Sequence, residues 1–345
     1  MVEIKAAQDD ENRRLDRILR KFSPDTPLSH IYRLLRKGNI RINGKKAGAE
    51  DVCLRVMAGD VIAVPDEFFA ARDSSARNRT GAASREAPSI PPDARFRVVF
   101  ENDDLLVINK SAGVVVHGGA FPQKQKNLAE MVESYLGDTI PRSLSFKPGP
   151  LHRLDQPTSG LVMFSKSLAG ARRFTALIRE RKIVKRYLAL VDGLVERAEL
   201  WRDDLVRDSE ERTTFAMKCA ISGARDSRYA ETYVEPVASN SVYSLVFAEI
   251  HTGRTHQIRS QAALHGHPLA GDKKYGGSFL KTGLLLHAYS LEFPSETGLP
   301  VLNAPLPHAF QQVIKNEFPS FHHVLAPPPR LGLANAGHRS AGAKN

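Results

Sequence analysis

The sequence is poor in cysteine and has no long apolar run. Its 345 residues include two cysteines, Cys53 and Cys219, which lie far apart and match no zinc-ligand spacing. This excludes a disulfide framework and suits a reducing compartment. No apolar stretch approaches the roughly 20 residues of a membrane-spanning helix, and the charged start Met1–Lys5 lacks a signal-peptide core. We therefore expect a cytoplasmic protein with no membrane partner.

Two common catalytic patterns are also missing. There is no glycine-rich loop of the Walker type, which argues against an ATPase. There are no clustered carboxylates of the kind that a metal-dependent nuclease requires. His256, His265 and His267 lie close in sequence, but no cysteine or carboxylate joins them in a recognised zinc pattern. We therefore expect no metal.

What the sequence has in excess is positive charge. It has 49 Lys and Arg against 38 Asp and Glu, a formal net charge of +11. A polyanionic partner follows, and nucleic acid fits better than a membrane surface because no amphipathic lipid-binding stretch accompanies the charge. The length predicts two domains, and 42% hydrophobic residues are ample for a core.

Most of this excess lies between Arg13 and Lys46, and we predict that residues 13 to 66 form a small RNA-binding module. An i, i+3, i+4, i+7 apolar stripe from Leu15 predicts one short helix. Ser29 can cap a second helix, and Asn43-Gly44 is a strong hairpin signal. The remaining basic face either binds RNA phosphates or only aids solubility. Its cations are Arg33, Arg36, Lys37, Arg41, Lys45 and Lys46.

Residues 69 to 95 and 326 to 345 are poor in large apolar side chains, which predicts a flexible linker and a disordered tail. Residues 96 to 325 between them form the predicted catalytic domain. Its apolar patterns predict strands at 96–100, 105–108, 161–164, 187–191 and 243–250, and helices at 127–136, 166–182 and 257–265. For residues 197 to 228 we expect only surface strands and loops.

The most informative stretch is Leu151-His152-Arg153-Leu154-Asp155, directly after Pro148-Gly149-Pro150. Residues 157 to 160 favour a turn, and the apolar run that follows predicts a strand entering a core. Asp155 is thus a carboxylate in a tight loop beside Arg153, which favours its ionised form. A reactive carboxylate and a purely structural Arg–Asp ion pair both fit, and on these residues alone the ion pair is the more common explanation.

This stretch, together with Thr158-Ser159-Gly160, resembles the active-site motif of the RluA family of RNA pseudouridine synthases. Other motifs follow in the family's order, and the resemblance covers roughly residues 96 to 325. Where the family usually has proline, this chain has Ser111. The other motifs are residues 107–110 with 112–113, residues 185–187 with Gly193, residues 252–259, residues 271–272 with 275–276, and residues 286–288.

The resemblance implies an isomerase that detaches uracil from its ribose and rejoins it through carbon. Because no redox change occurs and no group is gained, no cofactor is expected. Asp155 would be the catalytic residue, which attacks the sugar, attacks the base or removes a sugar proton. Tyr187 would offer a face on which the flipped base stacks, and Arg259 would pair with Asp155 and hold its charge.

The remaining roles implied by the resemblance concern RNA. Arg153 would fill the space left by the flipped uridine, with His152 beside it. Three further residues are candidates for positioning phosphates or lining the cleft: Lys110, Arg254 and His256.

The implied fold is α+β: a mixed, largely antiparallel bent sheet with flanking helices, plus the small α+β module. That module resembles the alpha-L RNA-binding motif of a small-subunit ribosomal protein. Family members with it act on large-subunit ribosomal RNA, so we expect that RNA as partner and a monomeric enzyme, most like the C-type. The alternative is a non-catalytic ribosome-assembly factor, which would have no need of Asp155 in this context.

Overall fold

The structure is a computed structural model that describes residues 1–22, 26–48, 50–69, 96–118, 126–137, 146–208, 213–218 and 227–320. The predicted tail, and the predicted linker beyond residue 69, lie outside these ranges. The chain divides into two compact units. The first contains Met1–Ile183, Pro294–Gly298 and Leu302–Pro305, and the second contains Val184–Phe293, Leu299–Val301 and the residues from Leu306 onward.

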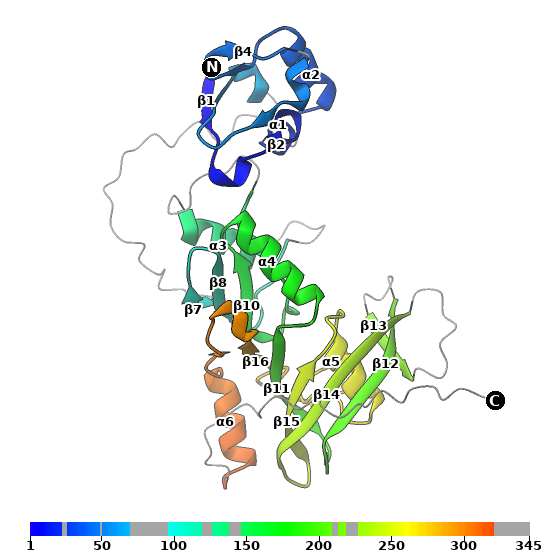
Figure 1. Cartoon of the computed structure of the whole chain (residues 1–345). Helices are drawn as coiled ribbons and strands as arrows, with labels where there is room; N and C mark the ends of the chain where they lie inside the picture. Colours follow the sequence, from blue (N-terminus) through cyan, green and yellow to red (C-terminus); the bar gives the residue numbers. More distant parts are fainter. Residues whose placement is uncertain are drawn as a thin grey trace, which may run out of the picture. The chain divides into compact units, whose positions relative to one another are not determined.

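The N-terminal part of the first unit is a small α+β module (Figure 1). A four-stranded sheet has the order β1-β6-β3-β4, and β2 pairs with β5. Helices α1 and α2 supply the buried core through Leu15, Ile18, Ile31 and Leu35. The elements are β1 (Val2–Lys5), η1 (Gln8–Asp10), β2 (Arg13–Arg14), α1 (Leu15–Phe22), α2 (Leu28–Arg36), β3 (Arg41–Ile42), β4 (Lys45–Lys46), η2 (Glu50–Cys53), β5 (Arg55–Val56), β6 (Val61–Val64) and η3 (Asp66–Phe69).

Two helices and a hairpin are therefore present as predicted, with two differences. Helix α2 begins at Leu28 after the N-cap Pro27, so the prediction that Ser29 caps it is wrong. Strand β1 pairs with β6 along Val2–Lys5, so the sheet starts before residue 13. Asn43 and Gly44 both have positive φ, 50° and 80°, as the tightest hairpin turns require.

All six cations predicted to form the basic face are exposed. Arg33 and Arg36 lie in the last turn of α2, where positive charge also complements the helix dipole. Arg41, Lys45 and Lys46 belong to the β3–β4 hairpin. Their contact with RNA stays a prediction.

The rest of the first unit holds the Asp155 motif. Strand β10 pairs antiparallel with β8 and with β9, and β8 pairs antiparallel with β7. Every residue of β10 is buried, as the apolar run predicted. Helix α3 starts with a capping box in which Asn127 and Glu130 exchange hydrogen bonds. The elements are β7 (Phe96–Glu101), β8 (Leu105–Lys110), α3 (Leu128–Leu136), β9 (Gly149–Pro150), β10 (Ser159–Ser165), α4 (Leu168–Arg179), η6 (Ser295–Thr297) and β17 (Leu302–Asn303).

The second unit is built on antiparallel strands in the order β13-β12-β14-β15-β11-β16. One face packs Leu188, Leu190 and Phe247 against Phe310 and Ile314 of α6. Helix α5 contacts β12 and β13. The elements are β11 (Val184–Asp192), β12 (Glu199–Asp208), β13 (Thr213–Lys218), β14 (Arg228–Ser239), β15 (Tyr243–Ile250), α5 (Gln257–Leu264), β16 (Leu286–Glu292) and α6 (His308–Glu317).

The predicted α+β class with predominantly antiparallel pairing is confirmed. The polar stretch from 197 to 228 contains two long strands, β12 and β13, which pair with each other and, through β12, with β14. Among the helices that the structure describes, none has the length and apolarity needed to cross a membrane.

Candidate active site

The loop that carries Asp155 is fastened to the loop after β8. The Gly113 amide donates to the carbonyl oxygen of Gln156 at 2.8 Å, and the Gln156 side-chain amide donates back to the carbonyl of Gly113 at 3.1 Å. The Thr158 amide donates to the carbonyl of Asp155 at 3.1 Å, which closes a turn. The backbone at Asp155 is thus fixed from both sides, while its side chain is half-buried.

Lys110 lies beneath this loop and holds it together. Its side chain is 0% exposed, and its Nζ donates to the carbonyls of Ser111, Val114 and Gln156 at 3.0, 2.9 and 3.3 Å. An ammonium has three donors, and these three carbonyls occupy them in this structure. That Lys110 positions a phosphate or lines the RNA cleft stays a prediction.

The same ammonium also affects Asp155 electrostatically. Burial lowers the pKa of Lys110 to about 8, and attraction to the Asp155 carboxylate opposes this shift. Lys110 therefore stays charged at neutral pH. Its ammonium thus places a positive charge near the Asp155 carboxylate.

His152 and Arg153 differ in exposure. The Met163 amide of β10 donates to His152 Nε2 at 3.1 Å, so the ring nitrogen that accepts carries no proton and the neutral ring is protonated on Nδ1. His152 thus joins the motif to the strand that follows it. Arg153 is exposed. The predicted parts of both residues in extruding a base stay predictions.

Arg259 of α5 is almost fully buried, at 6% exposure. Its Nε and Nη2 donate to the two carboxylate oxygens of Asp272 at 2.7 and 2.8 Å, and its guanidinium lies 5.0 Å from the ring centre of Tyr275. Sequence reasoning did not identify Asp272 as a partner, although Gly271-Asp272 was part of the family pattern. The predicted pairing of Arg259 with Asp155 stays a prediction.

His256 precedes α5 in a left-handed conformation, with φ of 54°. The Tyr275 hydroxyl accepts from the Thr214 amide at 3.0 Å and forms a hydrogen bond with His256 Nδ1 at 2.8 Å. Arg254 is exposed, and its Nε donates to the carbonyl of Tyr229 at 3.1 Å. Whether Arg254 and His256 line an RNA cleft stays a prediction.

The three histidines considered as metal ligands each contact a protein group. His256 contacts Tyr275, His265 contacts Asp203 at 3.1 Å and stacks on Trp201, and His267 contacts the carbonyl of Asp192 at 3.1 Å. Within the described residues no group of three potential metal ligands is found.

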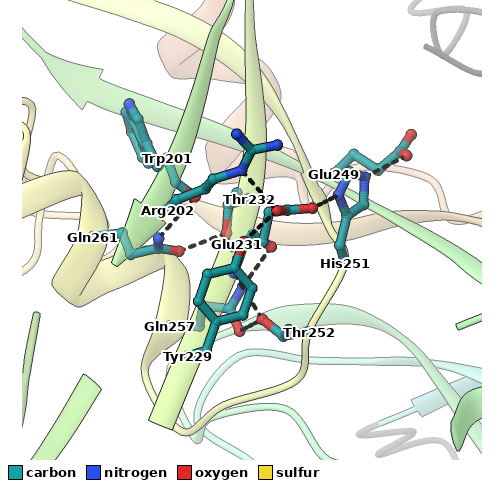
Figure 2. Close-up of polar contacts among 10 residues, drawn as sticks. All are labelled: Trp201, Arg202, Tyr229, Glu231, Thr232, Glu249, His251, Thr252, Gln257 and Gln261. Atoms are coloured by element: carbon teal, nitrogen blue, oxygen red, sulfur yellow. Dashed lines mark hydrogen bonds and ion pairs between the residues drawn. The ribbon is translucent and has the colours of Figure 1, made fainter. Parts of the chain in front are cut away.

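A ladder of buried hydrogen bonds fixes α5 on the sheet (Figure 2). Thr252 Oγ1 donates to Gln257 Oε1 at 2.8 Å, and Gln257 Nε2 donates to Thr232 Oγ1 at 2.8 Å. Thr232 Oγ1 then donates to Gln261 Oε1 at 2.6 Å, and Gln261 Nε2 donates to Asp203 at 2.7 Å. Gln257 and Gln261 are four residues apart and so share one helix face. This spacing is the signal in the sequence that could have predicted the ladder.

A charged cluster extends the ladder along β14 and β15. His251 directs Nδ1 at Glu231 (2.8 Å) and Nε2 at Glu249 (3.1 Å), as Figure 2 shows. Both ring nitrogens face carboxylates, so both are donors and the ring is charged. The hydrogen bond to Glu249 is the main cause that raises the pKa of His251, against the opposing effect of burial. Burial opposes ionisation of Glu231, but hydrogen bonds from Tyr229, His251 and Arg202 lower its pKa to about 2.

The stability that is lost when His251 is removed should depend on pH. A group whose pKa is raised by folding contributes stability that is fully present below its ordinary value, about 6.5 for histidine. That contribution is lost as pH rises through the raised value. His251→Gln should lower the free energy of unfolding by about 2 kcal/mol near pH 6, and by less at alkaline pH.

Urea unfolding at several pH values measures this difference. His308→Gln provides the control, because His308 is exposed on α6 and should show little effect at any pH. A loss for His251→Gln that is equal at all pH values would mean that the ring is neutral in the folded protein.

Comparison with known proteins gives a consistent result. Residues 104–264 match the family model described as RNA pseudouridylate synthase. The chain is 32% identical over 325 residues to ribosomal large subunit pseudouridine synthase C of Buchnera aphidicola subsp. Schizaphis graminum, covering 88% of this chain and 93% of that protein. It is 30% identical over 334 residues to the protein of that name from Salmonella typhimurium, covering 90% and 95%.

Among solved structures, human RNA pseudouridylate synthase domain containing 4 is similar in fold. The TM-score is 0.52 at 22% sequence identity, covering 63% of this chain and 91% of that chain. At this identity the similarity concerns the fold alone.

Proposed function

The chain belongs to the RluA-type RNA pseudouridine synthase family, and we propose that it converts specific uridines of large-subunit ribosomal RNA to pseudouridine. It is an isomerase, and the relatives' activity argues against the non-catalytic assembly factor. The choice of RNA is supported by similar proteins named for the large ribosomal subunit, which align over about 90% of this chain. Ribosomal RNA as substrate places the reaction in the cytoplasm, and we expect a monomer.

The reaction breaks the bond between ribose C1′ and uracil N1 and forms a bond between C1′ and uracil C5. The proton leaves C5 and N1 gains one, so atoms and electrons balance without a redox partner, and we expect no cofactor. The single observation that carries the proposal is Asp155 in its HRLD context, held in a fixed loop above the Lys110 ammonium. This carboxylate attacks the sugar, attacks the base or removes a sugar proton.

The other residues of the site have supporting parts in this proposal. Tyr187 stacks on the flipped base, and Arg153, which is exposed, fills the space that the base leaves. His152 positions the motif through its hydrogen bond to Met163. Arg259 helps to hold the charge of Asp155, and the ion pair with Asp272 orients the Arg259 guanidinium.

The N-terminal module is proposed to hold the RNA near this site. Its exposed cations on α2 and the β3–β4 hairpin suit phosphates, which fix position without reading sequence. Because they are tethered to the catalytic domain, their binding raises the effective concentration of RNA at the active site.

A pseudouridine map of ribosomal RNA from a strain that lacks the gene tests the proposed function. We expect particular large-subunit positions to remain uridine and to become pseudouridine again when the gene is restored. The purified protein should then modify the same positions in a transcript without added metal or nucleotide. An unchanged map, with no activity on the transcript, would contradict ribosomal RNA as the substrate.

A further inference from the structure

Lys185 lies two residues before Tyr187 on β11, opposite Ile250 of β15. Side chains alternate along a strand, so Lys185 and Tyr187 lie on one face of the sheet. Leu188 and Leu190 lie on the other, against α6. Two residues along a strand span about 6.6 Å, so the ammonium is within a side chain's length of the predicted stacking surface.

Lys185 has no counter-charge among the residues that the structure describes. Burial lowers the pKa of its ammonium, and no ion pair or hydrogen bond of this side chain occurs within the described residues. The adjacent Arg186 shows the contrast. It is 2% exposed and pairs with Glu249 at 2.9 Å and Glu292 at 3.0 Å.

The end of the Lys185 side chain lies beside Gly253. Gly253 is exposed, and Lys185 Nζ, at 3.9 Å, is the only atom of the described residues within 4 Å of a Cβ placed on it, its chain neighbours apart. Gly253 belongs to the Thr252–His256 loop that leads into α5. The ammonium therefore lies beside an uncovered turn of backbone, where a ligand can approach it.

Lys185 is partly buried, and even partial removal of an unpaired charge from water is costly unless a partner is supplied. An anion that binds beside Gly253 would supply that partner. The anionic group of RNA is the phosphate, to which lysine binds as a point charge. A uracil carbonyl is a weaker candidate, because it is neutral.

From this geometry we propose that Lys185 binds a phosphate oxygen of the RNA strand next to the nucleotide whose base stacks on Tyr187. The inference rests on the proposed function, and it adds a phosphate site inside the catalytic domain, separate from the basic module. Phosphate contacts fix the register of a nucleic acid, so Lys185 sets where along the strand the target base enters.

The test pairs a change in the protein with a change in the RNA. Lys185→Met keeps the length of the side chain and removes its charge. In the RNA, each phosphate near the target uridine is replaced in turn by a neutral methylphosphonate. Wild-type protein should bind the RNA about 10-fold more weakly when the methylphosphonate is at one particular position, and with unchanged affinity when it is at any other. Lys185→Met should bind unmodified RNA about 10-fold more weakly than wild type does, as expected for one charge-assisted contact.

Binding of Lys185→Met to the methylphosphonate RNAs shows whether the lysine and the phosphate form the same contact. At that one position the double change should cost no more than either single change, because both remove the same contact. For Lys185→Met, the slope of the logarithm of the binding constant against the logarithm of salt concentration should also become shallower by about one. Lys185→Arg should restore most of the binding. Lys182→Met is the control, because Lys182 is exposed, pairs with Glu180 and should leave binding unchanged.

Three results would overturn the proposal. One is wild-type binding that is insensitive to every methylphosphonate near the target, a measurement that needs no variant. Another is Lys185→Met that binds RNA with wild-type affinity and wild-type salt dependence. The proposal would also fail if the affinity losses from Lys185→Met and from the methylphosphonate added at every position, as they would if Lys185 contacted a uracil carbonyl. An inactive wild-type protein would instead refute the proposed function, so the two failures are distinguishable.

Discussion

Asp155→Asn should abolish pseudouridine formation and leave the fold intact. The amide keeps the shape of the carboxyl but has neither its charge nor its nucleophilic oxygen. Losses of about four orders of magnitude follow comparable substitutions at catalytic carboxylates. The backbone hydrogen bonds that fix the loop, from Thr158 to the carbonyl of Asp155 and from Gly113 to that of Gln156, do not involve the side chain. The melting temperature and RNA affinity should therefore stay close to wild type.

Release of tritium from carbon five of labelled uridine in a ribosomal RNA transcript measures the reaction directly. Asp103→Asn is the matched control, because it removes an exposed carboxylate from the β7–β8 turn and should leave the rate unchanged. Substantial tritium release by Asp155→Asn with a normal melting curve would show that the reactive group lies elsewhere.

Lys110→Met should cost both stability and activity. Three carbonyls in partly buried hydrogen bonds would lose their donor at once, and an unsatisfied buried polar group costs about 1–3 kcal/mol. We expect the free energy of unfolding to fall by about 3 kcal/mol or more. Turnover should fall even where the variant is folded, since the Asp155 loop would lose its support and the carboxylate a nearby positive charge.

Urea unfolding and tritium release on the same samples separate the two effects. Lys166→Met is the control, because Lys166 makes an ion pair with Glu101 nearer the surface, and such pairs contribute at most about 1 kcal/mol. If Lys110→Met were as stable and active as Lys166→Met, the three hydrogen bonds would not support the catalytic loop.

The parts of this protein that sequence predicted are those whose cause is local. The apolar run of β10, the Asn43-Gly44 turn and the basic faces of α2 and its hairpin follow from residues next to one another. The motif around Asp155 was found because its unusual residues are contiguous, and its catalytic interpretation needed the family resemblance.

The parts that sequence missed depend on partners far along the chain. Lys110 looks like a surface lysine until Gln156, 46 residues away, supplies a carbonyl. Arg186 is neutralised by carboxylates 63 and 106 residues away. Sequence predicted only surface strands and loops where β12 and β13 lie, because the position of these polar strands depends on their pairing. Such contacts leave no periodic pattern, so local reasoning could not find them.

The pairing of β1 with β6 has a consequence for how the module forms during synthesis. Val2 lies opposite Val64, so the ribosome makes one strand about 60 residues before its partner. At 5–20 residues per second the delay is about 3–12 s. During that interval α1 and α2 can form, but the sheet cannot close. The nascent module should therefore acquire its basic helix before its sheet, and chaperones would meet β1 as an unpaired strand.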